Sequence, residues 1–164
     1  MRETTVRCAI AGGGPAGTVL GVLLARAGVD VLVLEKHADF LRDFRGDTIH
    51  PSTLEIVHEL GWLEEFLAVP HEKVPEVRAQ FGDVTTTVAD FRHLPTRCRF
   101  IALMPQWDFL DFLARHGAAY ATFRLWMRAE ATGLLEEGGR VVGLEVSTPE
   151  GPLAASTPGA SSSR

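Results

Sequence analysis

Three glycines near the start of the 164-residue chain have the spacing of a nucleotide-binding turn. Gly12, Gly14 and Gly17 follow a short apolar stretch in the pattern G-x-G-x-x-G. The first glycine permits a sharp bend, the second lets a pyrophosphate approach the backbone, and the third lets helix and strand pack closely. Pro15 and Ala16 then fall in the first turn of a helix, where proline needs no N–H. The unpaired N–H groups of that turn and the helix dipole predict an anion site.

An acidic residue follows the glycines at the distance that ribose recognition requires. Glu35 ends a second apolar stretch about twenty residues later, where a carboxylate can accept hydrogen bonds from the hydroxyls of an adenosine ribose. Lys36 suggests a 2′-phosphate as an alternative, although a lone lysine after a strand is more often a solvated charge. A glycine-rich turn can also serve only to begin a helix, but Glu35 and the flanking strands favour a cofactor site over that interpretation.

The elements that would position these residues form a strand, a helix and a second strand. Residues 6–11 and 31–34 are short and apolar, as expected for strands of a parallel sheet. Between them we expect a helix that ends at Gly28. Its larger apolar side chains are predicted to form the buried face: Val19, Leu20, Leu23, Leu24 and Ala27.

The rest of the chain continues this α/β pattern with additional hairpins. A helix is expected from Ser52, as N-cap with Glu55 as its capping-box partner, to the stop at Gly61. Alternation of apolar and polar residues predicts a hairpin over 74–91 and a second hairpin over 132–147, around a turn at 136–139. Gln106 opens a further helix, whose predicted buried face comprises Phe109, Leu110, Phe112 and Leu113. Residues 151–164 hold too little apolar surface to order themselves, so we expect a disordered tail.

Composition excludes several classes of function. The formal net charge is −5 with scattered arginines, which argues against a nucleic-acid surface. Cys8 and Cys98 are far apart and the histidines lack metal-ligand spacing, so neither a disulfide framework nor a metal site is expected. No apolar run is long enough for a membrane span, and the polar start leaves no room for a signal peptide. A cytoplasmic location is therefore expected.

Three stretches together resemble the single-component FAD monooxygenases, the flavoprotein aromatic hydroxylases of the para-hydroxybenzoate hydroxylase type. The glycine turn with Glu35 is similar to that family's N-terminal FAD fingerprint. The segment 45–55, Arg-Gly-Asp-Thr-Ile-His-Pro-Ser-Thr-Leu-Glu, is similar to its arginine segment. Met104-Pro105-Gln106 is similar to the position at which a glutamine contacts the ribityl chain.

The resemblance, which spans residues 6 to about 149, implies a Rossmann-like FAD-binding domain over 1–150, incomplete at its C-terminus. It assigns FAD contacts to Arg45 and Gln106, and it makes hairpin 74–91 the start of a substrate-covering sheet. It implies NAD(P)H as reductant and hydroxylation of a small aromatic substrate through a flavin hydroperoxide. No side chain has to act as a nucleophile in that chemistry, so no catalytic residue is predicted.

The chain departs from the family after the second hairpin. The family's apolar strand leading to an Asp-Gly motif, and its later Gly-Asp motif, are both missing, so an N-terminal fragment is expected, and an out-of-frame end is one hypothesis for the tail. A truncated, inactive nucleotide-binding remnant is therefore an alternative to an active hydroxylase. An NAD(P)-dependent dehydrogenase is a third, less favoured because no dehydrogenase catalytic pair is apparent.

Overall fold

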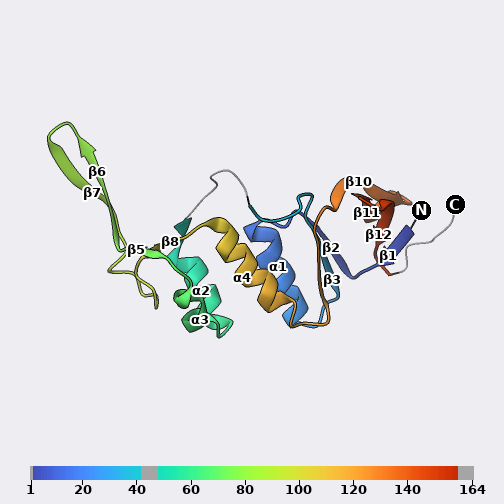
Figure 1. Ribbon diagram of the computed structural model, residues 1–164, viewed down its shortest axis with the longest axis horizontal. Helices are drawn as coiled ribbons and strands as arrows, with labels where there is room; N and C mark the ends of the chain where they lie inside the picture. Colours follow the sequence, from blue (N-terminus) through green and yellow to red (C-terminus); the bar gives the residue numbers. More distant parts are fainter. Residues whose placement is uncertain (1, 42–47, 159–164) are drawn as a thin grey trace. The chain divides into compact units, whose positions relative to one another are not determined.

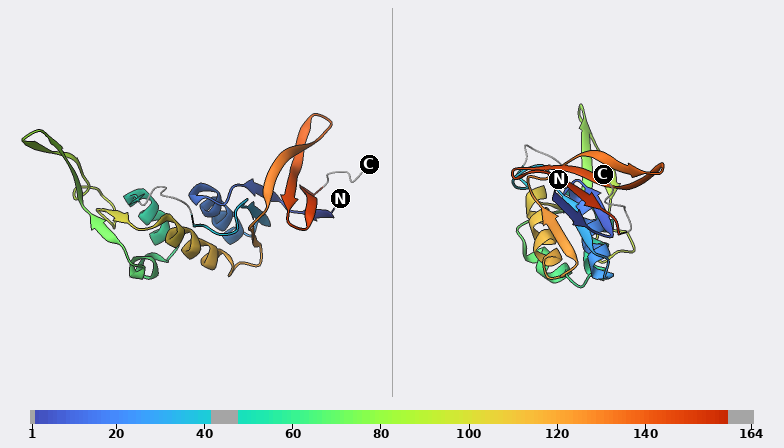
Figure 2. Two further views of the ribbon diagram at one scale, coloured as in Figure 1. Left: turned by 45° about the horizontal axis from the view of Figure 1, so that its top comes forward. Right: turned by 90° about the vertical axis from the view of Figure 1, so that its right-hand side faces the viewer.

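The computed structural model describes residues 2–41 and 48–158. The chain forms two compact units, residues 1–41 with 110–164 and residues 42–109, and this division lies inside the range predicted as one domain. Each unit has its own sheets, which can be followed in Figures 1 and 2. The predicted α/β class is confirmed.

A three-stranded parallel sheet forms the centre of the first unit. Its strands β2 (Cys8–Ala11), β3 (Val31–Leu34) and β9 (Phe123–Trp126) lie in the order β2-β3-β9, with α1 (Pro15–Arg26) connecting the first two. All four residues of β3 are buried, as expected for a parallel strand covered on both faces. The predicted strand-helix-strand unit is thus confirmed.

Helix α1 packs on this sheet through small residues, and the predicted buried face was wrong. Leu20 and Leu23 are 48% and 39% exposed. The buried residues recur at helical spacing instead: Thr18, Gly21, Val22 and Ala25. A Cβ at Gly21 would lie 2.5 Å from Val33 Cγ2, so the helix approaches β3 too closely for larger side chains. Size alone was therefore a poor guide to which face is buried.

A second sheet covers the other face of β3. It comprises β1 (Arg2–Thr5), β12 (Gly151–Ser156), β11 (Arg140–Thr148) and β10 (Glu130–Glu137), in that order. Leu32 and Leu34, which alternate with Val31 and Val33, contribute to a core shared by the two sheets. The other buried members of this core are Val6, Ala129, Val146, Leu153 and Ala155. The predicted hairpin is present as β10 and β11, with positive φ at both Gly138 and Gly139 in its turn.

Strand β12 corrects the prediction of a disordered tail from residue 151. It pairs in parallel with β1 and antiparallel with β11, and Val6 N–H donates to Ser156 O at 2.9 Å. Leu153, Ala154, Ala155 and Ser156 are all buried. The segment needs little apolar area of its own because partner strands on both sides satisfy its backbone groups. The remainder of the predicted tail, 159–164, lies outside the described residues.

The second unit holds a small antiparallel sheet, two short helices and a hairpin. The sheet order is β4 (Thr48–Ile49), β8 (Ile101–Leu103), β5 (Glu72–Val74). Helices α2 (Pro51–Glu59) and α3 (Leu63–Ala68) contribute the buried side chains of Leu54, Val57 and Phe66 to this unit. Helix α4 (Gln106–Gly117) begins in this unit, and its four predicted core residues are all buried. Phe109 meets the edge of Phe66 at a centroid distance of 5.7 Å.

The start of α2 differs from the predicted capping box. The N-cap is His50, whose side chain makes no capping hydrogen bond, and Pro51 occupies the first turn. The carboxylate of Glu55 instead accepts a hydrogen bond from Arg97 N–H at 3.0 Å. Proline is favoured at the first helical position, so the N-cap lies at His50, two residues before the predicted Ser52. The predicted stop at Gly61 is confirmed by its φ of +83°.

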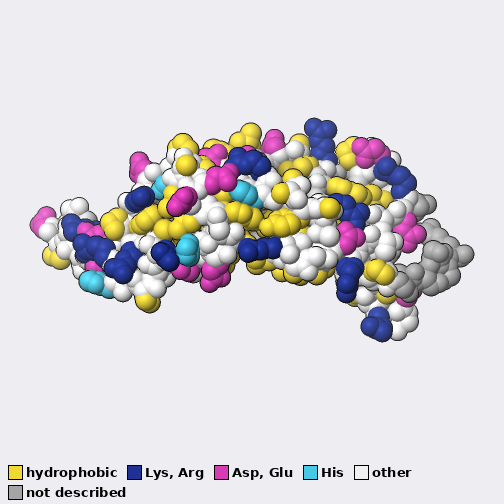
Figure 3. Space-filling view, turned by 90° about the horizontal axis from the view of Figure 1, so that it is seen from below, with side chains coloured by type: hydrophobic (Ala, Val, Ile, Leu, Met, Phe, Trp, Pro, Cys, Tyr) yellow, Lys and Arg dark blue, Asp and Glu magenta, His cyan; other side chains and the backbone are white. Residues whose placement is uncertain are grey.

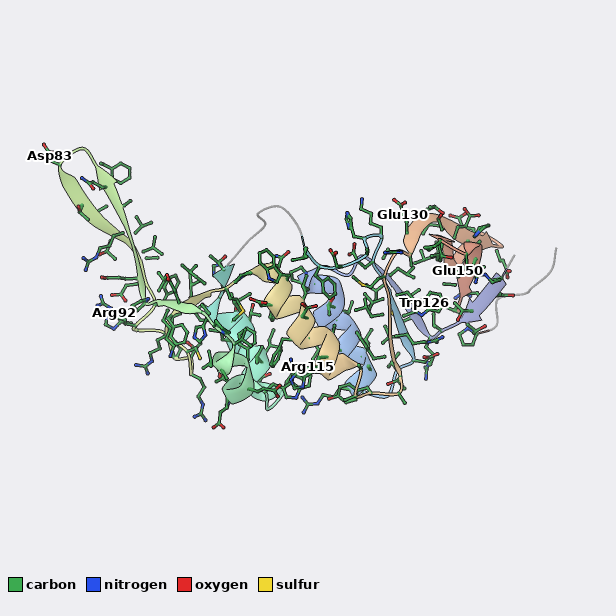
Figure 4. The ribbon with its side chains drawn as sticks, viewed as in Figure 1. Asp83, Arg92, Arg115, Trp126, Glu130 and Glu150 are labelled. Atoms are coloured by element: carbon green, nitrogen blue, oxygen red, sulfur yellow. The ribbon has the colours of Figure 1, made fainter. Side chains whose placement is uncertain are left out.

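The predicted hairpin over 74–91 is present as β6 (Glu76–Phe81) and β7 (Val84–Asp90). Figure 4 shows Asp83 at its tip and Arg92 near its base. Arg92 bridges Glu76 and Asp90 there, and its guanidinium holds the pKa of the Asp90 carboxyl far below its usual range. Phe81 and Val84, which pair beside the tip, are 68% and 65% exposed.

Acidic and basic side chains are intermixed over the face of the molecule in Figure 3. No helix within residues 2–41 and 48–158 is long and apolar enough to cross a membrane.

Burial of β12 gives a direct test of its place in the second sheet. We expect Leu153→Ala to lower the free energy of unfolding by about 2–4 kcal/mol, because Leu153 is 6% exposed within the shared core. Leu134→Ala is the matched control in the same sheet; Leu134 is 58% exposed, so its loss should change stability by less than about 0.5 kcal/mol. Urea unfolding measures both, and equal effects would contradict the burial of β12.

Candidate cofactor site

The glycine turn connects the end of β2 to the beginning of α1. Gly12 has a φ of +109°, a conformation that L side chains rarely adopt, and its N–H donates to Leu34 O at 2.8 Å. A Cβ at Gly17 would overlap the carbonyl oxygen of Gly12 and lie 3.2 Å from Ile10 Cγ2. The tight turn at Gly12 and the close helix-strand approach at Gly17 are therefore confirmed.

The first turn of α1 has the features of an anion site. Gly14 is the N-cap and Pro15 follows it, while Ala16 is exposed. The first N–H groups of a helix have no intrahelical acceptor, and the helix dipole makes this end positive. The first turn contains no acidic side chain that would compete for these donors. A Cβ at Gly14 would meet no atom within 4 Å, so the turn is open at the glycine predicted to admit a pyrophosphate.

Glu35 lies against this turn, as a ribose-binding carboxylate must. Glu35 follows the buried strand β3, and the residue as a whole is only 8% exposed. Glu35 Oε2 accepts a hydrogen bond from Gly13 N–H at 3.1 Å. A buried carboxylate is costly unless its oxygens are hydrogen-bonded, and this contact meets part of that need. Backbone donors and a carboxylate acceptor are thus brought together at the carboxyl ends of β2 and β3.

Two residues that sequence reasoning missed hold the turn in place. A Cβ at Gly13 would lie 2.8 Å from Glu35 Cβ, so the middle glycine leaves room for the glutamate. Thr18 is fully buried, and its hydroxyl donates to Gly13 O at 2.9 Å. The run of three glycines was the only available signal for Gly13, because the G-x-G-x-x-G pattern leaves that position unspecified.

The end of β9 extends this edge of the sheet. Glu35 N–H donates to Trp126 O, and Ala129 N–H donates to Glu35 O, each at 2.8 Å. Arg128 N–H donates to His37 O at 2.8 Å. Arg128 has a φ of +55° and is the only residue other than glycine with a positive φ in the described part of the chain. Such strained residues cluster at functional sites, and this one joins the ends of β9 and β3.

The remaining predicted site residues are Lys36, Gln106 and Arg45. Lys36 is exposed beside Glu35. Gln106 is the first residue of α4 and belongs to the second unit, so its contact with a cofactor stays a prediction. Arg45 lies outside the described residues.

A cavity of about 380 Å³ lies in the first unit, beyond the predicted site residues. It is lined by Trp126 and Arg128 at the end of β9 and by Arg2 and Glu150, among others. Figure 4 labels Trp126 and Glu150. Arg2 forms an ion pair with Glu150 and donates to the Thr148 hydroxyl at 3.1 Å. These protein contacts explain the position of the Arg2 side chain without a ligand.

Residues 3–149 match the family model described as an FAD binding domain. The chain belongs to this FAD-binding domain family. The turn, the open Gly14 position and the adjacent Glu35 carboxylate fit the pyrophosphate and ribose of FAD.

The chain is similar to two monooxygenases and to the solved structure of an FAD-dependent halogenase. A 6-methylpretetramide 4-monooxygenase from Streptomyces rimosus is 30% identical over 135 residues, which are 82% of this chain and 32% of the relative. An aromatic compound monooxygenase from Bacillus subtilis (strain 168) is 33% identical over 129 residues, 79% of this chain and 25% of the relative. The structure of the myxobacterial chondrochloren halogenase, an FAD-dependent halogenase, superposes on this chain with a TM-score of 0.79 and is 25% identical in sequence. The superposition covers 96% of this chain and 36% of the halogenase chain.

The chain therefore corresponds to an FAD-binding domain and spans about a quarter to a third of the length of these two curated relatives. The resemblance stated from sequence is confirmed.

Gly14 and Gly17 have different surroundings, so an added methyl group should affect stability differently at the two positions. Gly17→Ala should lower the free energy of unfolding by at least about 2 kcal/mol, because the added Cβ overlaps a backbone carbonyl. Gly14→Ala should cost less than about 1 kcal/mol, since its Cβ enters open space and its φ of −71° is ordinary. Urea unfolding without cofactor compares them, and equal losses would show that α1 does not approach β2 as described.

Proposed function

We propose that this chain binds FAD as part of an NAD(P)H-dependent monooxygenase that hydroxylates a small aromatic molecule. The observation that carries the proposal is the 3.1 Å contact between Glu35 Oε2 and Gly13 N–H. It puts a hydroxyl acceptor beside the N-terminus of α1, which is a phosphate-binding position. One ligand that carries a ribose and a pyrophosphate can use both.

Each predicted contact then has a specific role. The N-terminus of α1, with Gly12, Gly14, Pro15, Ala16 and Gly17, receives the pyrophosphate, while Glu35 accepts from the adenosine ribose. Lys36 lies beside the ribose end and supplies a positive charge there. The family resemblance implies that Arg45 lies close to the ribityl and pyrophosphate groups and that Gln106 contacts the ribityl chain.

FAD supplies the redox chemistry when it is bound, and the protein supplies binding, orientation and electrostatics. No side chain of this chain is assigned a catalytic role. The names of two relatives, an uncharacterized aromatic compound monooxygenase and a 6-methylpretetramide 4-monooxygenase, support an oxygenase, and the first of these names supports an aromatic substrate. The fold is also that of a halogenase, so the fold alone does not determine the reaction.

The competing dehydrogenase hypothesis is disfavoured by membership of an FAD-binding family. The remnant hypothesis differs in one measurable property, because a remnant would hold flavin weakly or not at all. FAD affinity therefore separates it from the proposed function.

We expect the purified chain to bind FAD and to keep it through desalting, as flavin absorbance would show. Gly14→Val fills the open space of the turn, and Glu35→Ala removes the ribose acceptor, so each should weaken FAD binding at least about tenfold. Glu150→Ala is the control, because this glutamate of the same unit is 70% exposed and lies on the β11–β12 turn. A folded wild-type chain that binds no FAD would contradict the proposal and favour the remnant.

The reductant is tested on the FAD-loaded chain under anaerobic conditions. Bleaching of the bound flavin by NADH or NADPH would support the oxygenase proposal. A loaded chain that neither nucleotide reduces would contradict the NAD(P)H part while leaving FAD binding intact.

A further inference from the structure

His37 makes two contacts with the same oxygen of Glu35. Its backbone N–H donates to Glu35 Oε1 at 2.9 Å, and its ring Nδ1 lies 2.6 Å from that oxygen. We propose that His37 is a positioning residue that orients the Glu35 carboxylate for the ribose hydroxyls. This inference rests on the proposed FAD site and adds to it a residue that neither the glycine motif nor the family resemblance singled out.

The direction of the ring contact follows from the chemistry of the two groups. An ionised carboxylate can only accept hydrogen bonds, so Nδ1 carries the proton and donates to Oε1. At 2.6 Å this is a short contact of the charge-assisted kind. The backbone N–H and the ring of His37 thus hold Oε1 from two directions.

The contacts on the two carboxylate oxygens fix the plane of the group. The terminal torsion of a glutamate is broad, so a carboxylate held at one oxygen still rotates about its last bond. Here Oε1 is held by His37 and Oε2 by Gly13 N–H. With its plane fixed, the carboxylate is preorganised for the ribose, and less ordering has to accompany binding.

The backbone of His37 is anchored independently of its ring. Its carbonyl accepts from Arg128 N–H, and the adjoining Glu35 carbonyl accepts from Ala129 N–H. The His37 side chain is 46% exposed, whereas that of Glu35 is 10% exposed. Replacement of the imidazole should therefore leave the fold and the backbone N–H contact with Oε1 intact and remove only the hydrogen bond from the ring.

The test compares His37→Ala with His37→Asn in the full chain. Asparagine places an N–H donor near the position of Nδ1, whereas alanine removes it. We expect His37→Ala to weaken FAD binding about five- to tenfold, as measured by flavin fluorescence, and His37→Asn to restore most of the affinity. His93→Ala is the matched control, since His93 is also exposed and lies 3.6 Å from a carboxylate oxygen, that of Asp90 in the second unit.

A second readout distinguishes positioning from a merely structural role. Wild type should bind ADP more tightly than 2′-deoxy-ADP, because the carboxylate is aligned with the ribose hydroxyls. This preference should shrink in His37→Ala, return in His37→Asn, and stay unchanged in His93→Ala. The unfolding midpoint without ligand should be the same in all four proteins.

Unchanged FAD affinity and unchanged ADP preference in His37→Ala would overturn the inference, as would an asparagine variant no better than alanine. If Glu35→Ala weakens FAD binding and His37→Ala does not, only the role of His37 fails. If the folded wild type binds no FAD, the proposed function fails and the role of His37 fails with it.

Discussion

A close backbone approach between α1 and β2 determines where a cofactor site can form in this chain. No Cβ fits at Gly17, because it would overlap the carbonyl oxygen of Gly12. The approach brings the first turn of α1 to the carboxyl ends of β2 and β3, where Glu35 accepts from Gly13 N–H. The backbone donors at the start of α1 and a carboxylate acceptor therefore share one edge of the sheet, which is the edge at which ligands of open α/β sheets bind.

Strand β3 connects this edge to the rest of the first unit. Its alternate residues pack toward α1 and toward the second sheet, so both faces are covered and all four residues are buried. Glu35 follows immediately and is fixed by backbone hydrogen bonds to Trp126 and Ala129. The carboxylate is thus held by the most completely packed strand of the sheet, as a preorganised binding group should be.

Local signals predicted the turn, the strands within residues 6–11 and 31–34 and both hairpins, because glycine spacing and two-residue alternation act over short stretches of chain. Other features depended on the tertiary arrangement and were not predicted, among them β12, the buried face of α1 and the contact of His37 with Glu35. The pairing of β12 with β1 joins residues about 150 positions apart. Leu20 and Leu23 were predicted to be buried, but α1 faces β3 through Gly21, which leaves both leucines exposed. The contact of His37 with Glu35 depends on the backbone hydrogen bonds from Arg128 and Ala129, which follow β9, to the chain after β3. No local sequence pattern predicts these hydrogen bonds.

The central claim is that one edge of the first unit binds the ADP half of FAD through the turn and Glu35 together. Amide NMR spectra recorded during titration with ADP test it most directly. The account predicts shifts of the backbone amides within residues 12–18 and 35–37, with the amides of β6 and β7 unmoved. Shifts confined to β6 and β7, or a folded chain whose turn amides do not respond to ADP, would contradict it.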